Sequence, residues 1–296
     1  MPTELSKGTL FDPKLVTDLI TKVKGKSSLA VLSNQTPIPF NGLKEFIFTM
    51  DSEVDVVAEN GKKTHGGISL EPVKIVPIKV EYGARISDEF LYATEEEKID
   101  ILKSFNDGFA IKLARGLDIM AFHGVNPRTG SASNVIGDNH FDSKVTQKVE
   151  FDAAAANDNI EDAVELLTAN EYTPSGMAMA PTMRSALAKL KDGNGRKLYP
   201  ELAWGATPSS LNGLSVDTNP TVSANSNKDR AIIGDFAGAF KWGYAKQIPM
   251  EIIKYGDPDN SGKDLKGYNQ VYLRAEAYLG WGILDPKAFS RVTDEA

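Results

Sequence analysis

Residues 94–123, TEEEKIDILKSFNDGFAIKLARGLDIMAFH, constrain the fold more than any other stretch of the chain. Thr94 followed by Glu97 is a capping box, and acidic residues in the first turn suit the positive end of a helix dipole. Gly124 and then Asn126-Pro127 are typical of a helix end. The pattern predicts one amphipathic helix, roughly 45 Å long at 1.5 Å per residue. Its apolar stripe recurs every three or four residues, at Leu102, Phe105, Phe109, Leu113, Leu117 and Met120.

The stretch before this helix, residues 44–87, predicts a long β-hairpin. Apolar residues alternate along the outgoing arm, a turn-rich tip covers residues 59–67, and an apolar return arm continues to Tyr82. Pro72 and Pro77 confine the return arm to the edge of a sheet. Because an isolated two-stranded hairpin is only marginally stable in water, we expect a partner subunit to lie against it.

The remaining segments predict an α+β fold. A short amphipathic helix is expected over residues 13–24, with Asp12 as its N-cap and Pro13 at its first position. Helices at 160–170 and 181–191 enclose a buried strand at 176–180, an order typical of a mixed domain. Short strands are expected at 211–216 and 231–234, and two long antiparallel strands at 248–255 and 269–284.

The composition excludes several classes of protein. No apolar run approaches the ~20 residues of a membrane span, so we expect no membrane partner. The chain has no cysteine, and its three histidines are far apart in sequence, so we expect neither a metal nor another cofactor. The net charge of −7 argues against tight binding to nucleic-acid phosphates.

One loop has part of a calcium-binding pattern. Asp257, Asp259, Ser261 and Gly262 match the start of an EF-hand loop, but the twelfth position is Tyr268 in place of a bidentate glutamate. The flanking segments are also predicted to be strands, not helices. We therefore predict a solvated hairpin loop over residues 256–267.

The order of these elements resembles the major capsid protein of tailed bacteriophages, the Hong Kong 97-type fold shared with encapsulin shells. The resemblance extends from about Leu29 to Val292, and its most specific stretch is DVVAE at residues 55–59, similar to the family's extended E-loop. Further similarities lie at residues 190–196 (LKDGNGR), 211–216 (LNGLSV), 233–236 (IGDF) and 285–289 (DPKAF).

The resemblance implies an N-arm, an E-loop, a peripheral domain with a spine helix, and an axial α/β domain. The implied ranges are 1–43 for the N-arm, 44–87 for the E-loop, 88–149 for the peripheral domain with its spine helix at 94–123, 150–247 for the axial domain, and 248–296 for the return strands and C-terminus. It also implies hexamers and pentamers of this chain that close into an icosahedral shell around double-stranded DNA. The expected location is the virion, with assembly in the host cytoplasm. Because the arm begins at Met1, we expect a separate scaffolding protein or none, besides a portal protein and a decoration protein as further partners.

Some members of this family join their subunits by an isopeptide bond, which a lysine near the E-loop tip forms with an asparagine, assisted by a glutamate. Alignment to the family implies Lys63, Asn269 and Glu276 for these roles. The structural alternative is that Lys63 is solvated, that Asn269 opens a strand, and that Glu276 pairs with Lys74, Lys79 or Arg274. Strict strand alternation also puts Asn269 and Glu276 on opposite faces. The E-loop residues implied to contact other subunits are Asp55, Val56, Val57, Ala58, Glu59, Asn60, Gly61, Lys62 and Lys63.

Two other functions fit parts of the sequence. The same fold serves as an encapsulin-type compartment that encloses enzymes, and DNA inside the particles would distinguish a phage shell from it. A soluble α/β hydrolase is the alternative from another class, but the sequence has no Gly-x-Ser-x-Gly elbow and no phosphate-binding loop. We therefore expect a structural protein, with self-cross-linking as its only chemistry.

Overall fold

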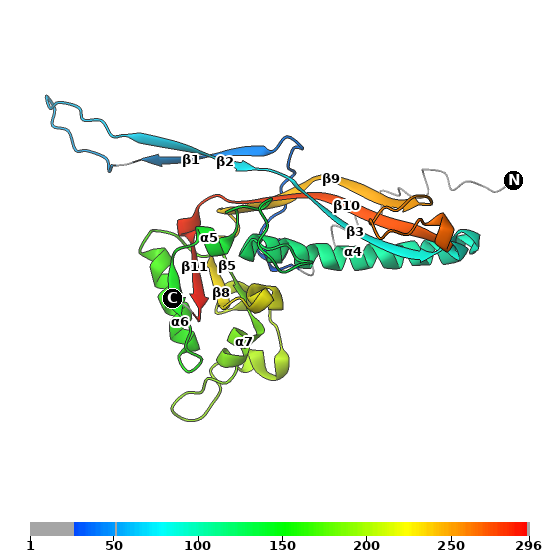
Figure 1. The fold of residues 1–296 in the computed structure, drawn as a ribbon. Helices are drawn as coiled ribbons and strands as arrows, with labels where there is room; N and C mark the ends of the chain where they lie inside the picture. Colours follow the sequence, from blue (N-terminus) through cyan, green and yellow to red (C-terminus); the bar gives the residue numbers. More distant parts are fainter. Residues whose placement is uncertain (1–26, 51, 295–296) are drawn as a thin grey trace.

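The computed structural model describes residues 27–50 and 52–294, and the helix expected over residues 13–24 lies outside them. The described chain is elongated (Figure 1). A β-hairpin projects at one end of the molecule. A long helix and a three-stranded sheet lie side by side and extend toward the other end. A six-stranded sheet with shorter helices lies on one side of the molecule, between the hairpin and the far end of the long helix.

The long helix is the element that the sequence predicts most accurately. Helix α4 spans Glu95–His123, and Thr94 and Glu97 form both hydrogen bonds of the capping box, at 3.3 and 3.1 Å. Gly124 ends the helix in the left-handed conformation, with a φ of 66°. The predicted apolar stripe is buried along its length except at Phe105, which is half-buried.

Helix α4 packs against an antiparallel sheet with the strand order β3-β10-β9. The strands are β3 (Ile78–Ser87), β9 (Phe240–Ile253) and β10 (Gln270–Ile283). The pairing of β9 with β10 confirms the two long antiparallel strands predicted near the C-terminus, although β9 begins earlier than residue 248. Phe109 and Leu113 of the helix share one core with Ala277 and Leu279 of β10.

The hairpin is shorter than the sequence predicts. Its strands are β1 (Leu43–Met50) and β2 (Ile68–Ile75), paired from Leu43 with Ile75 to Met50 with Ile68. The prediction that the return arm continues to Tyr82 is wrong, because residues 78–87 form β3 and pair with β10. Pro77 lies at the break, and since it has no N–H it cannot donate to a ladder.

A six-stranded sheet with the order β4-β11-β8-β5-β7-β6 forms the second core. Asn212 and Gly213 have positive φ values and turn the chain between β6 and β7. The prediction of a single strand at 211–216 is therefore wrong, because this segment contains parts of two strands joined by a turn. The C-terminal strand β11 pairs with β4 and β8, and thus lies in this sheet and not beside β9 and β10. The bounds are β4 (Lys148–Glu150), β5 (Gly176–Met179), β6 (Ser210–Leu211), β7 (Leu214–Thr218), β8 (Asp229–Gly234) and β11 (Phe289–Thr293).

Short helices cover this sheet and its connections. Helix α6 confirms the helix predicted at 160–170, whereas α7 ends before residue 191, where the prediction placed its end. The bounds are α3 (Ser28–Leu32), α5 (Phe141–Lys144), α6 (Ala156–Thr168), α7 (Pro181–Leu187), and the 3-10 helices η1 (Asp88–Tyr92), η2 (Pro200–Gly205), η3 (Pro220–Ser226), η4 (Lys266–Tyr268) and η5 (Pro286–Ala288).

Aromatic rings join the two sheets to the end of α4. Phe141 lies at the centre, with its ring centroid 5.0 Å from Phe289, 5.5 Å from Phe122 and 5.7 Å from Phe240. These rings come from α4, α5, β9 and β11, and all four are fully buried. The junction between the two parts of the molecule is therefore a packed core.

Candidate assembly interface

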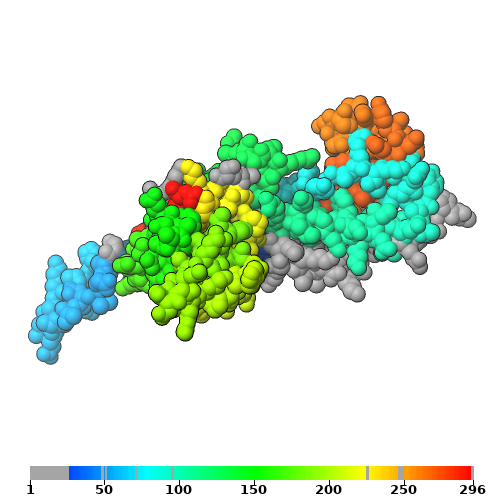
Figure 2. All heavy atoms as spheres, turned by 90° about the horizontal axis from the view of Figure 1, so that it is seen from below, coloured from blue at the N-terminus to red at the C-terminus, as the bar shows by residue number. Residues whose placement is uncertain are grey.

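The hairpin exposes apolar side chains on one face. Residues opposite each other in an antiparallel pair share a face, so Phe46 with Pro72 and Met50 with Ile68 line the same side, together with Leu70. Met50 is 70% exposed and Ile68 67% exposed. We call Phe46, Met50, Ile68, Leu70 and Pro72 the apolar hairpin face. Figure 2 shows the outer part of the hairpin projecting away from the rest of the molecule.

The opposite face of the hairpin is anchored only at its base. Ile75 is completely buried against β10, where a Cβ on Gly282 would lie 2.7 Å from the Ile75 side chain. Lys241 Nζ of β9 lies 2.7 Å from the carboxylate of Glu45. These contacts fix where the hairpin leaves the body, and they leave the apolar hairpin face free within the described chain.

The predicted E-loop residues lie beyond the paired strands. Residues 52–67 form an irregular loop, with one turn closed by the hydrogen bond from Gly61 N–H to Ala58 O at 2.8 Å. Thr64 donates to Asp55 across the loop at 2.6 Å. All nine predicted contact residues, 55–63, are exposed, and Lys63 is among them.

The structure does not bring the predicted cross-linking residues together within one chain. Asn269 is exposed just before β10, whereas Glu276 is buried in the middle of that strand. Seven residues of strand separate them by roughly 23 Å. Glu276 lies 2.6 Å from Lys79 Nζ and 3.5 Å from Arg274 Nε, which are two of the three pairings considered as the structural alternative.

Asn269 has the strand-opening role that its position predicts. It adopts the left-handed conformation, with a φ of 54°, and ends η4 before β10 begins. Its carbonyl accepts a hydrogen bond from Asp88 N–H at 2.9 Å. Asparagine tolerates this backbone conformation better than most residues, so a local structural role accounts for its presence.

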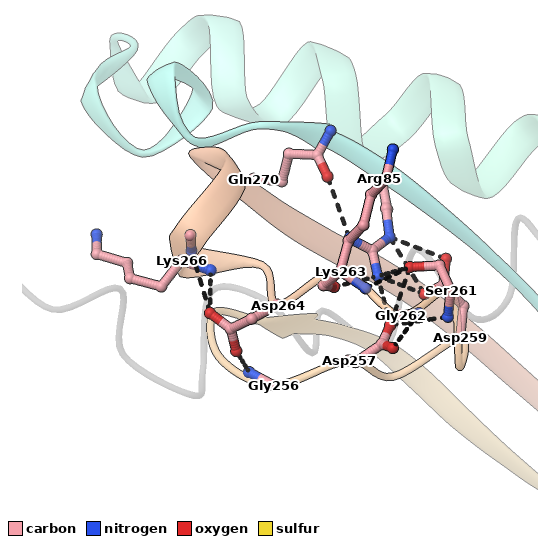
Figure 3. A network of polar contacts seen from close by, with 11 residues as sticks. Arg85, Gly256, Asp257, Asp259, Ser261, Gly262, Lys263, Asp264, Lys266 and Gln270 are labelled. Carbon is pink, nitrogen blue, oxygen red and sulfur yellow. Dashed lines mark hydrogen bonds and ion pairs between the residues drawn. The ribbon is translucent and has the colours of Figure 1, made fainter.

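The calcium-like loop between β9 and β10 folds around an arginine. Figure 3 shows Arg85 of β3 reaching into the loop, where Nη2 lies 2.6 Å from Asp257 Oδ1, 2.5 Å from Asp259 Oδ1 and 2.6 Å from Ser261 Oγ. The Lys263 carbonyl is 2.9 Å from the same atom. The hydrogen bonds from Arg85 hold the pKa of Asp259 well below its usual range.

The guanidinium therefore lies between Asp257 and Asp259 and offsets one of their two negative charges. The sequence shows the connection between two strands correctly, but gives no signal for Arg85. That residue lies far away along the chain and belongs to a strand that was predicted to be part of the hairpin.

Comparisons with known proteins agree with this architecture. A model of the phage capsid family matches residues 7–294. A solved structure from Mycobacterium phage Ogopogo is 32% identical, with a TM-score of 0.77 over 90% of this chain and 92% of its own. One from Gordonia phage Cozz is 26% identical, with a TM-score of 0.76 over 90% and 86%.

A more distant structure shares the fold. The capsid of an empty GTA particle is 16% identical, with a TM-score of 0.66 over 92% of this chain and 97% of its own. A comparison with curated protein sequences found no match. Among the described residues, no helix has the length and apolarity that a membrane span needs. The chain thus belongs to the phage capsid family, and it is a structural capsid protein of the virion with the Hong Kong 97-type fold.

Proposed function

We propose that copies of this chain assemble as hexamers and pentamers into an icosahedral shell that encloses double-stranded DNA. The observation that carries this proposal is the apolar hairpin face, because a two-stranded ribbon cannot bury it alone. Burial on a neighbouring copy stabilises the contact by about 25 cal/mol per Å² of apolar surface. Repetition over many copies lets weak individual contacts close a shell.

In this assembly the parts of the chain take the roles that the family resemblance implies. Residues 1–43 are the N-arm, and the β1–β2 hairpin with its tip is the E-loop, which ends at Ile75. Helix α4 with β3, β9 and β10 makes the peripheral domain, and the six-stranded sheet makes the axial domain. The net charge of −7 suits a wall that encloses DNA without gripping it. Assembly in the host cytoplasm, with scaffolding, portal and decoration proteins, completes the proposal.

Electron microscopy of the purified full chain tests this function. We expect closed particles with fivefold and sixfold capsomers, and DNA inside those taken from virions. Particles that hold an enzyme would favour the encapsulin-type compartment. Monomers under all conditions, even with a scaffolding protein supplied, would overturn the shell.

We also propose that Lys63 of one copy forms an isopeptide bond with Asn269 of another. Both side chains are exposed, as an intermolecular reaction requires. The neutral Lys63 amine attacks the Asn269 amide carbon, the new C–N bond forms, and the former amide nitrogen leaves as ammonia. Glu276 of a further copy is the candidate base, because Glu276 of the chain that carries Asn269 lies roughly 23 Å away along β10. It must first exchange its contact with Lys79 for one with the incoming lysine.

Denaturing gel electrophoresis of assembled particles tests this bond. We expect a ladder of covalent multimers that Lys63→Ala abolishes, because that variant lacks the nucleophile. Lys62→Ala is the matched control, since it removes the adjacent charge and should keep the ladder. Bands of monomer size alone from the unmodified chain would exclude the cross-link and leave the shell proposal standing.

A further inference from the structure

His123, the last residue of α4, faces two hydrogen-bond acceptors. Its Nδ1 lies 2.9 Å from Asp142 Oδ2 of α5, and its Nε2 lies 2.9 Å from the backbone carbonyl oxygen of Thr221 in η3. A neutral imidazole has one N–H and can satisfy only one acceptor, whereas the imidazolium has two. The ring side chain is 3% exposed, so water cannot replace a missing bond. Although burial opposes it, the hydrogen bond from His123 lowers the pKa of Asp142, so Asp142 is an acceptor and the geometry favours the doubly protonated ring.

Two carboxylates and an arginine surround this ring. Asp229 of β8 is completely buried, and Arg291 Nη2 of β11 lies 3.0 Å from its Oδ1 and 3.4 Å from Asp142 Oδ1. Asp142 Oδ1 and Asp229 Oδ2 have no hydrogen-bond donor among the described residues. A proton held by Asp229 and directed at Asp142 would satisfy both. The cluster thus contains two cations, which are the His123 imidazolium and the Arg291 guanidinium. It also contains the Asp142 carboxylate and the Asp229 carboxyl group, and these two share one proton.

The same three donor residues could in principle ligate a metal ion. Atoms of His123, Asp142 and Asp229 lie within 4.8 Å of one another. Both ring nitrogens of His123 are already hydrogen-bonded, however, and Arg291 supplies the positive charge between the carboxylates. Protons alone therefore complete the hydrogen bonds of this cluster.

We propose that His123, Asp142, Asp229 and Arg291 form a proton-dependent joint, in which the imidazolium holds the end of α4 to the six-stranded sheet and its deprotonation releases that end. The residues come from α4, α5, β8 and β11, which meet where the elongated part joins the six-stranded sheet (Figure 1). In a shell, subunits at different positions must tilt by different amounts. The role of the joint in allowing these tilts rests on the proposed function. The protonation of the joint is a property of the single chain.

The pH range follows from the direction of each shift. Burial disfavours the charged ring, but the hydrogen bond and the charge of Asp142 outweigh it and hold the pKa of His123 above 6.5. A raised pKa means that the stabilisation is fully present below pH 6.5 and is lost as the pH rises through the folded value. Burial, with the charge of Asp142, also raises the pKa of Asp229, so both groups destabilise the joint as the pH rises.

The other titratable groups near the ring act differently. Burial lowers the pKa of His140, which precedes α5, so this ring loses its proton before His123 does. Asp138, next to His140, and Asp118, on α4, are the remaining nearby acids. Asp118 contacts the Thr221 hydroxyl and does not touch the His123 ring. The alkaline response therefore belongs to His123 and Asp229, and His140, Asp138 and Asp118 are not assigned to it.

Imidazole nitrogen NMR of the full chain, labelled with ¹⁵N-histidine, tests the joint. The chain has only three histidines, which His65→Gln and His123→Gln assign. We expect His123 to show two protonated nitrogens at pH 6.5, where His140, whose pKa is lowered by burial, is largely neutral. A neutral His123 at pH 6.5 would overturn the proposal, even if the His123→Gln variant fails to fold.

Hydrogen exchange at the Gly124 amide supplies the second readout. After correction for the intrinsic rate, we expect protection in the unmodified chain and in His65→Gln to fall with rising pH, by up to about tenfold per unit between pH 6.5 and the folded pKa of His123. His123→Gln should show a shallower slope, because only the titration of Asp229 then remains. An equal slope in His123→Gln would contradict the joint. Stabilisation by Zn²⁺, with loss of the His123 N–H signals, would reassign the cluster as a metal site.

Discussion

Asp118 shows at the residue scale how one buried carboxylate joins distant parts of the chain. It lies on α4 and is completely buried. It accepts hydrogen bonds from the Ser27 hydroxyl, the Ser28 N–H at 2.9 Å and the Thr221 hydroxyl at 2.7 Å. The residue therefore fastens the start of α3 and the start of η3 to the same point of the long helix.

Asp118→Ala should destabilise the chain by about 3 kcal/mol, because it leaves several buried donors without an acceptor. Denaturant unfolding measures this loss. Asp100→Ala, which removes an exposed carboxylate from the same helix, is the control and should change stability little. Equal losses in the two variants would contradict the role of the buried contacts.

The same residue predicts a pH dependence. Burial raises the pKa of Asp118 to about 6, although the hydrogen bonds from Ser27 and Thr221 oppose this shift. The folded chain then keeps a proton that the unfolded chain has lost, so stability falls as the pH rises from 3.8 to about 6. The difference in unfolding free energy between the unmodified chain and Asp118→Ala should therefore shrink across this range.

Helix α4 illustrates at the element scale how one residue type has opposite effects at two positions. Gly108 lies inside the helix with no heavy atom within 4 Å of the place where a Cβ would stand. Gly124 ends the helix with a positive φ, and a Cβ there would lie 2.4 Å from the His140 ring. Glycine is thus a cost at the first position and a requirement at the second.

Gly108→Ala should raise the free energy of unfolding by about 0.5–1 kcal/mol, because alanine restricts the unfolded chain and meets open space in the helix. Gly124→Ala should lower it by more than about 1 kcal/mol, since the backbone conformation and the His140 contact both oppose a side chain. Thermal unfolding of both variants checks the signs. Two changes of the same sign would contradict this assignment.

At the scale of the whole molecule, stability and assembly depend on different surfaces. The two cores and the aromatic junction bury their side chains within one chain, whereas the apolar hairpin face buries none of its own. Among the described residues, the hairpin's contacts with the body lie at its base, around Ile75 and Glu45. Changes along the hairpin face should therefore affect assembly and leave the folding of the single chain intact.

Leu70→Glu puts a charge on the apolar hairpin face and should abolish or strongly reduce particle formation. Ser69→Glu adds the same charge to the other face of the same strand. This variant should assemble more readily than Leu70→Glu. Electron microscopy counts the particles, and circular dichroism at matched concentration shows that both chains are folded. Normal shells from Leu70→Glu would exclude the apolar hairpin face as an interface.

Local patterns determined much of this protein. The capping box, the apolar period and the terminal glycine determined α4, because hydrogen bonds and side-chain contacts in a helix join residues three or four apart. Alternation and turn residues likewise determined the β1–β2 hairpin and the β9–β10 pair. The order of these elements was enough to show the resemblance to the capsid family.

Long-range contacts were decided only by the tertiary structure. The sequence could not show that β3 leaves the hairpin for β10, that β11 completes the six-stranded sheet, or that Arg85 fills the acidic loop. The sequence shows Asp118 and His123 only as members of a helix. Their shared partner Thr221 lies about a hundred residues away along the chain, and the fold places it beside them. The physical reason is that many strands and many polar residues could serve as partners, and only the packing of the whole chain selects which ones meet.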